Sequence, residues 1–163
     1  MLLYDDREKE PDLLAALVAG AHSQNIDLAR RRLSHGDYNW RSERYGNIAI
    51  ERKSPADLCG SLTSGRLTKQ ARALIKDVDR PYLAITGSFY RGPNNTIYLP
   101  TATRQPKWNY DSVMGLLTRL ELDGLRVVHL VSEEWFIEWL LRMYRLSQVA
   151  GGKGKPQEKL TNE

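Results

Sequence analysis

Cysteine is almost missing from this sequence, which has one in 163 residues, and histidine occurs only three times. The single cysteine, Cys59, excludes an internal disulfide framework and is typical of a reducing compartment or of indifference to redox state. It lies in an apolar helical stretch with no thiolate-stabilising pattern, so we expect it to be buried and not catalytic. His22, His35 and His129 lack the spacing of metal ligands, which argues against a structural zinc site.

Long apolar runs are also missing, because none approaches the ~20 residues that a membrane span requires. The N-terminus passes from Met-Leu-Leu-Tyr directly to charged residues, unlike a signal peptide. No internal repeat is visible. These absences predict a cytoplasmic protein with no membrane partner.

The charge is modestly basic, with a formal value of +4 and a pI near 9.2. This net positive charge is compatible with binding to a phosphate-rich partner, but it does not indicate one by itself. The length and the even composition predict one α/β domain over 1–148. Residues 149–163 lack core formers, and we expect them to form a flexible C-terminal tail.

Apolar periodicity predicts alternating strands and helices. One helix begins at Pro11 and is expected to stop at Gly20, and another begins at Ser54-Pro55 with Ser54 as its N-cap. Residues 87–105 are expected to form a long loop or a loose hairpin around 96–99, either variable decoration or a DNA-shaping element. The other expected strands are 2–4, 26–33, 38–40, 45–50, 81–86 and 126–131, and the other expected helices begin at Gly65-Arg66, Asn109 and Glu133.

The most informative segment places acidic residues at the two ends of a hairpin. Asp37 precedes two short strands joined by a turn at 41–44, and Glu51-Arg52-Lys53 ends the second strand. Folding the hairpin brings Asp37 and Glu51 together. Because strand side chains alternate, Glu51 and Lys53 point to one face and Arg52 to the other.

These residue types suit the hydrolysis of a phosphodiester. A bound Mg²⁺ or Mn²⁺ can neutralise phosphate charge, generate a hydroxide and stabilise the leaving oxygen, and such hard cations prefer oxygen ligands. Lys53 would orient or deprotonate the attacking water. The sequence therefore predicts a metal-dependent nuclease.

The string as a whole resembles the ERCC4-type nuclease domain of the XPF/Mus81/Hef structure-specific endonucleases. The resemblance extends over roughly 2–146 and is carried by Asp5-Asp6-Arg7-Glu8, Gly36-Asp37, Glu51-Arg52-Lys53-Ser54-Pro55-Ala56-Asp57, Gly60-Ser61-Leu62, Gly65-Arg66-Leu67 and Gln70. The sequence departs from the family in a longer hairpin and in having no helix-hairpin-helix module after 146. We therefore expect DNA to be bound by a part other than a helix-hairpin-helix module.

The resemblance implies a restriction-endonuclease-like fold, a mixed central sheet flanked by helices, and a set of site residues. The expected metal ligands are Asp37, Glu51 and, directly or through water, Asp5, with Glu8 supporting Asp5. Arg7, Arg52 and Arg66 are expected to clamp phosphate oxygens, and the alternative for Arg52 is a pair with an acidic neighbour. The expected catalytic residues are Asp5, Arg7, Glu8, Asp37, Glu51, Arg52, Lys53 and Asp57, and the expected DNA contacts are Arg30, Arg31, Arg32, Arg41, Arg66, Lys69 and Gln70.

Several of these residues have plainer interpretations. Asp57, at the third helical position after Ser54, can serve as a capping residue. Arg30–Arg32 can be a solvated strand edge. Arg66 and Gln70 share a helix face that the resemblance places beside the metal site, and a surface pair without DNA contact is the alternative.

The last expected helix carries apolar residues on more than one face, which predicts a second buried surface and a homodimer; the alternative is a helix at the centre of the fold. The expected substrate is branched or flapped DNA in repair, recombination or replication, with a helicase or DNA-binding subunit possible in trans. The alternatives are a Holliday-junction resolvase, a non-catalytic DNA-binding scaffold and a regulatory interaction protein. The single-domain form is consistent with a prokaryotic or phage-infected cell; a eukaryotic source would imply the nucleus.

Overall fold

The computed structural model describes residues 1–149, and the expected tail lies, apart from Val149, outside the described residues. A six-stranded sheet of order β2-β1-β3-β4-β5-β8 forms the centre, in which β3 runs antiparallel to both neighbours and the other five strands are mutually parallel. The strands are β1 (Leu2–Asp5), β2 (Leu28–Arg31), β3 (Tyr38–Ser42), β4 (Gly46–Lys53), β5 (Arg80–Thr86) and β8 (Arg126–Leu130). This mixed sheet confirms the expected fold class.

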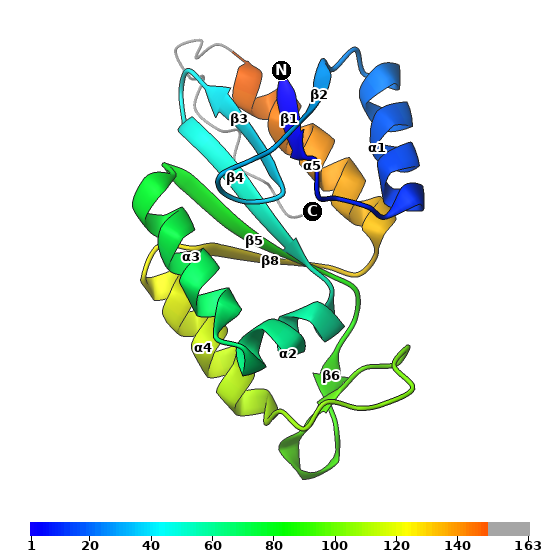
Figure 1. The fold of residues 1–163 in the computed structure, drawn as a ribbon, viewed down its shortest axis with the longest axis vertical. Helices are drawn as coiled ribbons and strands as arrows, with labels where there is room; N and C mark the ends of the chain where they lie inside the picture. The colour runs from blue at the N-terminus through cyan, green and yellow to red at the C-terminus, as the bar shows by residue number, and fades with distance from the viewer. Residues whose placement is uncertain (150–163) are drawn as a thin grey trace, which may run out of the picture.

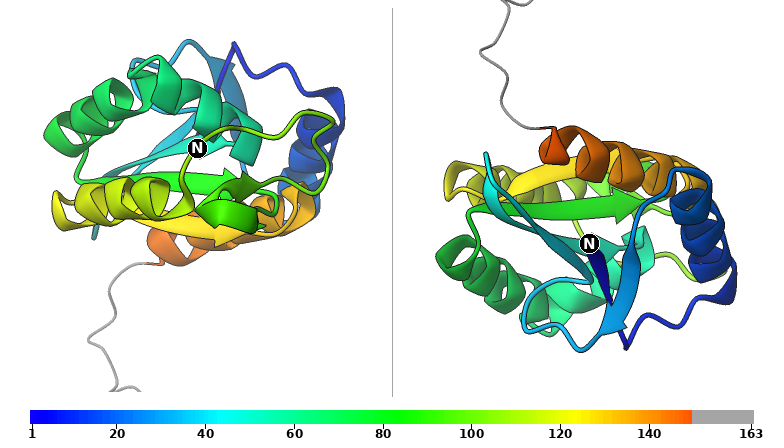
Figure 2. Two further views of the ribbon diagram at one scale, coloured as in Figure 1. Left: turned by 90° about the horizontal axis from the view of Figure 1, so that it is seen from below. Right: turned by 90° about the horizontal axis from the view of Figure 1, so that it is seen from above.

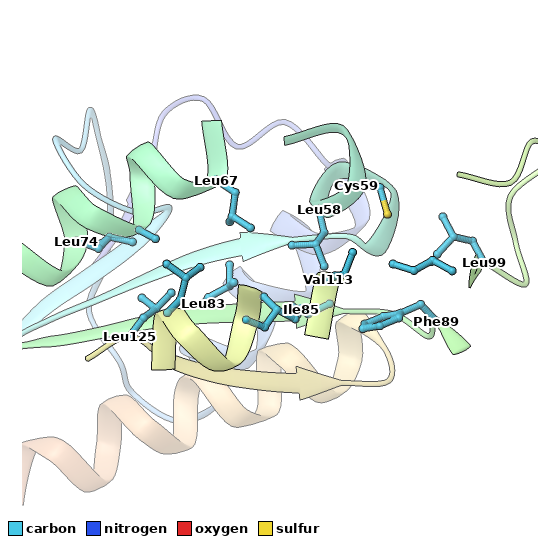
Figure 3. Packing of buried hydrophobic residues seen from close by; sticks show 14 of the residues in the cluster. Leu58, Cys59, Leu67, Leu74, Leu83, Ile85, Phe89, Leu99, Val113 and Leu125 are labelled. Carbon is cyan, nitrogen blue, oxygen red and sulfur yellow. The ribbon is translucent and has the colours of Figure 1, made fainter. Parts of the chain in front are cut away.

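Helices cover both faces of the sheet (Figures 1 and 2). The helices are α1 (Pro11–Ser23), α2 (Pro55–Thr63), α3 (Arg66–Asp77), α4 (Tyr110–Leu122) and α5 (Glu133–Gln148). Side chains of α1 and α5 share one core with the sheet, and side chains of α2, α3 and α4 share the other. Figure 3 shows this second core between α3, α4 and the strands. None of the helices in the described part of the chain is long and apolar enough to cross a membrane.

Strand β4 belongs to both cores because its side chains alternate. Ile48 and Ile50 lie in the core with α1 and α5, whereas Ala49 lies in the core with α2, α3 and α4. Glu51 and Lys53 continue the face of Ala49, and Arg52 continues the face of Ile50. The alternation that buries β4 therefore also separates Arg52 from its two neighbours.

Local signals explain most element boundaries. The hydroxyl of Ser54 accepts a hydrogen bond from the amide of Asp57, 3.1 Å away, and starts α2 as expected. Helix α1 does not stop at Gly20 but continues to Ser23. A Cβ on Gly20 would lie 2.7 Å from Leu141 Cδ1 of α5, so this glycine serves the close approach of two helices and not a helix end.

The chain between β5 and α4 forms a separate two-stranded hairpin of β6 (Tyr90–Arg91) and β7 (Ile97–Tyr98), with a short 3₁₀ turn at Pro93–Asn95. Figure 1 shows this segment projecting beyond the end of the main sheet, next to α2. The loose hairpin expected near 96–99 is thus present, with β7 as its second strand.

Candidate active site

A glycine turn fixes Asp37 beside the end of β4. Gly36 has a φ of +69°, and a Cβ there would lie 2.8 Å from the carbonyl oxygen of Ile50, so a side chain is excluded by space as well as by conformation. The amide of Asp37 donates to the carbonyl of Ile50 at 2.7 Å, and Asp37 Oδ2 accepts from the amide of Arg52 at 2.7 Å. Two backbone hydrogen bonds therefore hold the carboxylate against the Glu51-Arg52-Lys53 segment.

Glu51 is nearly completely buried and held from two sides. Its Oε1 accepts hydrogen bonds from Lys53 Nζ at 2.5 Å and from Gln70 Nε2 at 2.8 Å. Lys53 is also buried, so this ion pair is shielded from solvent. Gln70, expected to contact DNA, reaches from α3 and donates to the carboxylate of Glu51.

Asp37, Glu51 and Lys53 line one pocket of about 510 Å³ between the sheet end and helices α2 and α3. Other expected site residues also line the pocket, together with two residues that were not expected there, Ser34 and His35. Its lining includes Arg7, Ser34, His35, Gly36, Arg52, Asp57, Arg66 and Gln70. Ser34 was missed because nothing in its neighbourhood marks it chemically. His35, which pairs with Asp77 at 3.3 Å, was interpreted as a surface residue.

The electrostatics of this pocket favour a cation. Burial and the neighbouring charge of Glu51 raise the pKa of Asp37 to about 7. The side-chain oxygen of Gln70 is buried without a hydrogen-bond partner. Two close carboxylates and an unpartnered amide oxygen form a hard donor set, which fits Mg²⁺ or Mn²⁺.

Asp5, the expected third ligand, is not part of this donor set. Arg7 binds both of its oxygens, with Nε to Oδ1 at 2.6 Å and NH2 to Oδ2 at 2.9 Å, and the amide of Leu33 donates to Oδ2 at 2.8 Å. These bonds hold the pKa of Asp5 well below its usual range. No three acidic, histidine or cysteine side chains of residues 1–149 converge as a metal site. The direct metal contact expected of Asp5 is therefore corrected: it anchors Arg7 at the pocket.

Arg52 occupies the opposite face of β4, where it pairs with acids as the alternative expectation had it. Its guanidinium lies 2.9 Å from Glu10 and 3.4 Å from both Glu8 and Glu133, and its side chain is only 7% exposed. Glu8 thus supports Arg52 and not Asp5, which corrects its expected role. Because these carboxylates occupy the guanidinium, it does not clamp a phosphate in this structure.

This acidic cluster gives a first prediction, for Arg52→Met. The change leaves three carboxylates around a buried, uncompensated position, and we expect it to lower the free energy of unfolding by about 2–3 kcal/mol, reduced from the ~3–5 kcal/mol of a fully buried pair because Glu10 and Glu133 are half exposed. A hydrogen bond to Glu10 and burial raise the pKa of Glu133 to about 7. The loss should therefore shrink as pH falls through 7 and Glu133 protonates.

Urea titrations at pH 8 and pH 5 measure this loss, with Arg72→Met on the exposed face of α3 as the control. An equal loss at both pH values would show that Arg52 does not stabilise the protein through its charge.

The remaining expected DNA contacts divide by position. Arg30 and Arg31 end β2, where Arg31 pairs in register with Asp5, and Arg32 follows them and forms an ion pair with Asp6 at 3.0 Å. Arg66 lines the pocket, and Lys69 is exposed on the same helix. Arg41 pairs in register with Asn47, roughly 13–20 Å along β4 from Glu51 and Lys53. The structure therefore does not bring Arg41 to the site.

Asp57 retains its capping geometry. Ser54 Oγ donates to Asp57 Oδ2 at 2.9 Å while the amide of Asp57 donates to the same hydroxyl. The carboxylate faces the pocket rim but is exposed. Its observed contacts are those of a helix cap.

Known proteins were compared with this chain by sequence and by fold. A stretch of 84 residues, 52% of the chain, is 37% identical to the proteins named DNA repair endonuclease XPF of Cricetulus griseus and of Mus musculus. The chain spans only 8% of the length of these relatives.

The fold is similar to that of XPF from Aeropyrum pernix, with a TM-score of 0.68 at 23% identity, covering 90% of this chain and 64% of that one. A second structure, described as XPF from Aeropyrum pernix in complex with DNA, gives a TM-score of 0.64 at 23% identity, covering 92% of this chain and 67% of that one. The family model described as ERCC4 domain matches residues 4–143. Since this match extends from β1 into α5, the chain belongs to the ERCC4 domain family.

Proposed function

We propose that this chain is a divalent-metal-dependent endonuclease that hydrolyses phosphodiester bonds of branched or flapped DNA. The observation that supports this most is the meeting of Asp37, Glu51 and Lys53 in one pocket, from a turn and from alternate positions of a strand. Membership of the ERCC4 family and the similarity to XPF proteins agree with it. A role in DNA repair, recombination or replication follows from the same likeness.

Each side chain has a distinct part in the proposed reaction. Asp37 and Glu51 would hold Mg²⁺ or Mn²⁺, with the oxygen of Gln70 beside them. The bound metal would supply Lewis acidity and lower the pKa of a coordinated water. Lys53, whose Nζ lies 2.5 Å from Glu51 Oε1, is placed to orient the water as an ammonium group or, as the neutral amine, to accept its proton.

Two arginines at the pocket suit the charge of the substrate. Arg7 is fixed by Asp5 yet its side chain is 59% exposed, so its outer edge remains open to a phosphate oxygen. Arg66 is exposed at the start of α3 and has no acidic partner among residues 1–149. At the edge of the sheet, Arg31 is exposed and adds to this positive charge, whereas Arg32 pairs with Asp6.

Cleavage assays with labelled DNA test the proposal. A 3′-flap, a splayed arm, a four-way junction and a plain duplex are incubated with Mn²⁺, with Mg²⁺ and with EDTA. The proposal expects cleavage of a branched substrate that requires metal and leaves the duplex intact. Two symmetric nicks in the four-way junction would favour a Holliday-junction resolvase, and metal-independent binding without cleavage would favour a scaffold, against which the intact Glu51 and Lys53 argue.

Homodimer formation is a further part of the proposal. Helix α5 buries Phe136, Ile137, Leu140 and Leu141 against the sheet, but Trp135 and Leu146 are 59% and 61% exposed. These two side chains are eleven positions apart and lie on one face of the helix. The outer edge of β8, the last strand of the sheet, also has no partner strand in residues 1–149. These exposed apolar side chains support the proposal of a second apolar surface on this helix.

Trp135→Glu/Leu146→Glu tests the dimer. Sedimentation of the full chain should show a dimer for the wild type and a monomer for this variant, because two charges are placed in the centre of the apolar surface. Val18→Glu, at a 51% exposed apolar position on α1, is the matched control and should remain dimeric. A monomeric wild type at micromolar concentration would refute the homodimer and favour a DNA-binding subunit or helicase in trans.

A further inference from the structure

The segment 87–109 between β5 and α4, called the arm below, is built as an ordered element. Phe89, Ile97 and Leu99 are buried at its base and belong to the core of α2, α3 and α4. Figure 3 shows Phe89 and Leu99 at the end of this core where Cys59 also lies. The base of the arm is therefore fixed relative to the active-site helices.

Side-chain hydrogen bonds shape the outer part of the arm. Gln105 Oε1 accepts from the amide of Leu99 at 2.7 Å, and Gln105 Nε2 donates to the carbonyls of Leu99 at 2.9 Å and Ala102 at 3.1 Å. The amide of Ile97 donates to the carbonyl of Trp108 at 2.9 Å. Gln105 thus closes a loop that presents the residues after it, and a loop held in this way loses little entropy when a ligand binds.

Two tyrosines form a pair on the outer face of the hairpin. Tyr90 and Tyr98 are directly opposite each other in the β6–β7 register, so their side chains emerge on the same face. They are 54% and 44% exposed, whereas Ile97, opposite Arg91 on the other face, is buried. The outer face of the arm is therefore an aromatic surface that nothing in residues 1–149 covers.

All charged side chains of the arm are basic. Residues 87–109 contain Arg91, Arg104 and Lys107 and no aspartate or glutamate. Arg91 is neutralised by Asp111 of α4 and stacks over Tyr110. Arg104 and Lys107 are exposed and have no acidic partner within residues 1–149. Two free cations and two exposed aromatic rings in one segment are the combination that single-stranded nucleic acid binds.

A groove of about 800 Å³ connects the arm with α2. Ala56, Cys59 and Thr63 line it from the helix, and Arg104, Lys107 and Trp108 line it from the arm. A second hollow, which includes Tyr90, shares Ala56, Leu99 and Ala102 with this groove. Asp57, the neighbour of Ala56, lines the proposed active site. The groove and the active site therefore meet α2 at adjacent residues.

We propose that the arm binds the unpaired DNA strand of a branched substrate, with bases stacked on Tyr90 and Tyr98 and the backbone held by Arg104 and Lys107. This inference rests on the proposed nuclease function for its substrate. It assigns the recognition of the branch to this chain itself, at a groove that shares helix α2 with the proposed active site.

Oligothymidine binding in EDTA tests the arm without requiring cleavage. Fluorescence anisotropy of a labelled 20-nucleotide oligothymidine is measured with the full chain over a range of KCl concentrations. Tyr90→Ala/Tyr98→Ala should raise the Kd about tenfold or more, whereas Tyr90→Phe/Tyr98→Phe, which keeps both rings, should bind within about twofold of the wild type.

The two cations are tested by the salt dependence of the same binding. Arg104→Ala/Lys107→Ala should reduce the slope of log K against log[KCl] by about 1.4, since each single-strand phosphate contact contributes about 0.7. Lys76→Ala/Arg119→Ala removes the same two charge types from exposed positions on α3 and α4 and should leave the slope unchanged.

Wild-type affinity and slope in both arm variants would overturn the proposal. So would a change in sedimentation of Tyr90→Ala/Tyr98→Ala without a change in affinity, because the arm would then be a protein interface. A wild-type chain that binds oligothymidine through the arm but cuts no DNA would refute the nuclease and support the arm. If the chain cuts branched DNA but both arm variants bind oligothymidine like the wild type, the proposal for the arm is refuted and the nuclease function stands.

Discussion

Glu51→Gln is expected to reduce the rate of DNA cleavage by roughly a thousandfold or more while the protein stays folded. The amide keeps the shape of the side chain and an oxygen that can accept from Lys53 and Gln70, but it removes the negative charge that the metal requires. Loss of metal binding forfeits several kcal/mol of transition-state stabilisation, and each ~1.4 kcal/mol corresponds to a factor of ten in rate.

Three measurements separate this effect from misfolding. Cleavage of a flap substrate is followed in Mn²⁺, DNA binding is measured in EDTA, and circular dichroism reports the fold. We expect only cleavage to be lost. Glu121→Gln, at an exposed carboxylate on α4, is the matched control. If Glu51→Gln cuts within tenfold of the wild type, Glu51 is not a metal ligand.

Asp37→Asn is expected to make the metal-free protein more stable at pH 8 while it abolishes the response to metal. The folded protein keeps a proton on Asp37 up to about pH 7, but the ordinary pKa of the group is 3.8. Between these values the folded state binds more protons than the unfolded state, so the free energy of unfolding falls as pH rises. A shift of about three pKa units corresponds to about 4 kcal/mol, and we expect a gain of about 2–4 kcal/mol.

Denaturant titrations in EDTA at pH 4 and pH 8 test this expectation. The gain from Asp37→Asn should be present at pH 8 and absent at pH 4, where the wild-type carboxyl is protonated when folded. Saturating Mn²⁺ should stabilise the wild type by about 2.7 kcal/mol at a hundred times the Kd and should not stabilise the variant. Asp123→Asn, at an exposed carboxylate, should show neither effect. A destabilised variant at pH 8 would contradict this account of the pocket.

The site was predictable from the sequence where local rules decide the geometry. Strand alternation placed Glu51 and Lys53 on one face and Arg52 on the other, and the hairpin with Gly36 brought Asp37 to them. The fold class followed from the alternation of strands and helices and from the resemblance, and the ERCC4 match confirms the family.

The errors arose where a side chain chooses between partners that are distant in sequence. Asp5 carries the same charge as Asp37, but Arg7 and the amide of Leu33 saturate it, and Leu33 is 28 positions away. Arg52 is 81 positions from Glu133. No pattern of spacing along the chain reveals which of several acids a guanidinium will meet.

The expected roles of Gly20 and Gln70 were wrong or incomplete for a similar reason. Gly20 was expected to end a helix, although the close approach of α5 explains it better. Gln70 was assigned to DNA because it shares a face with Arg66, yet its amide donates to Glu51. Both assignments depend on how helices pack on the sheet, which sequence periodicity predicts only as a buried face and not as individual contacts.

The central claim is that Asp37 and Glu51 hold one divalent cation. Anomalous diffraction from crystals of the protein soaked in Mn²⁺ measures this directly. We predict a peak within about 2.3 Å of carboxylate oxygens of both residues. A pocket without a peak at saturating Mn²⁺, or a peak bound to other side chains only, would contradict it.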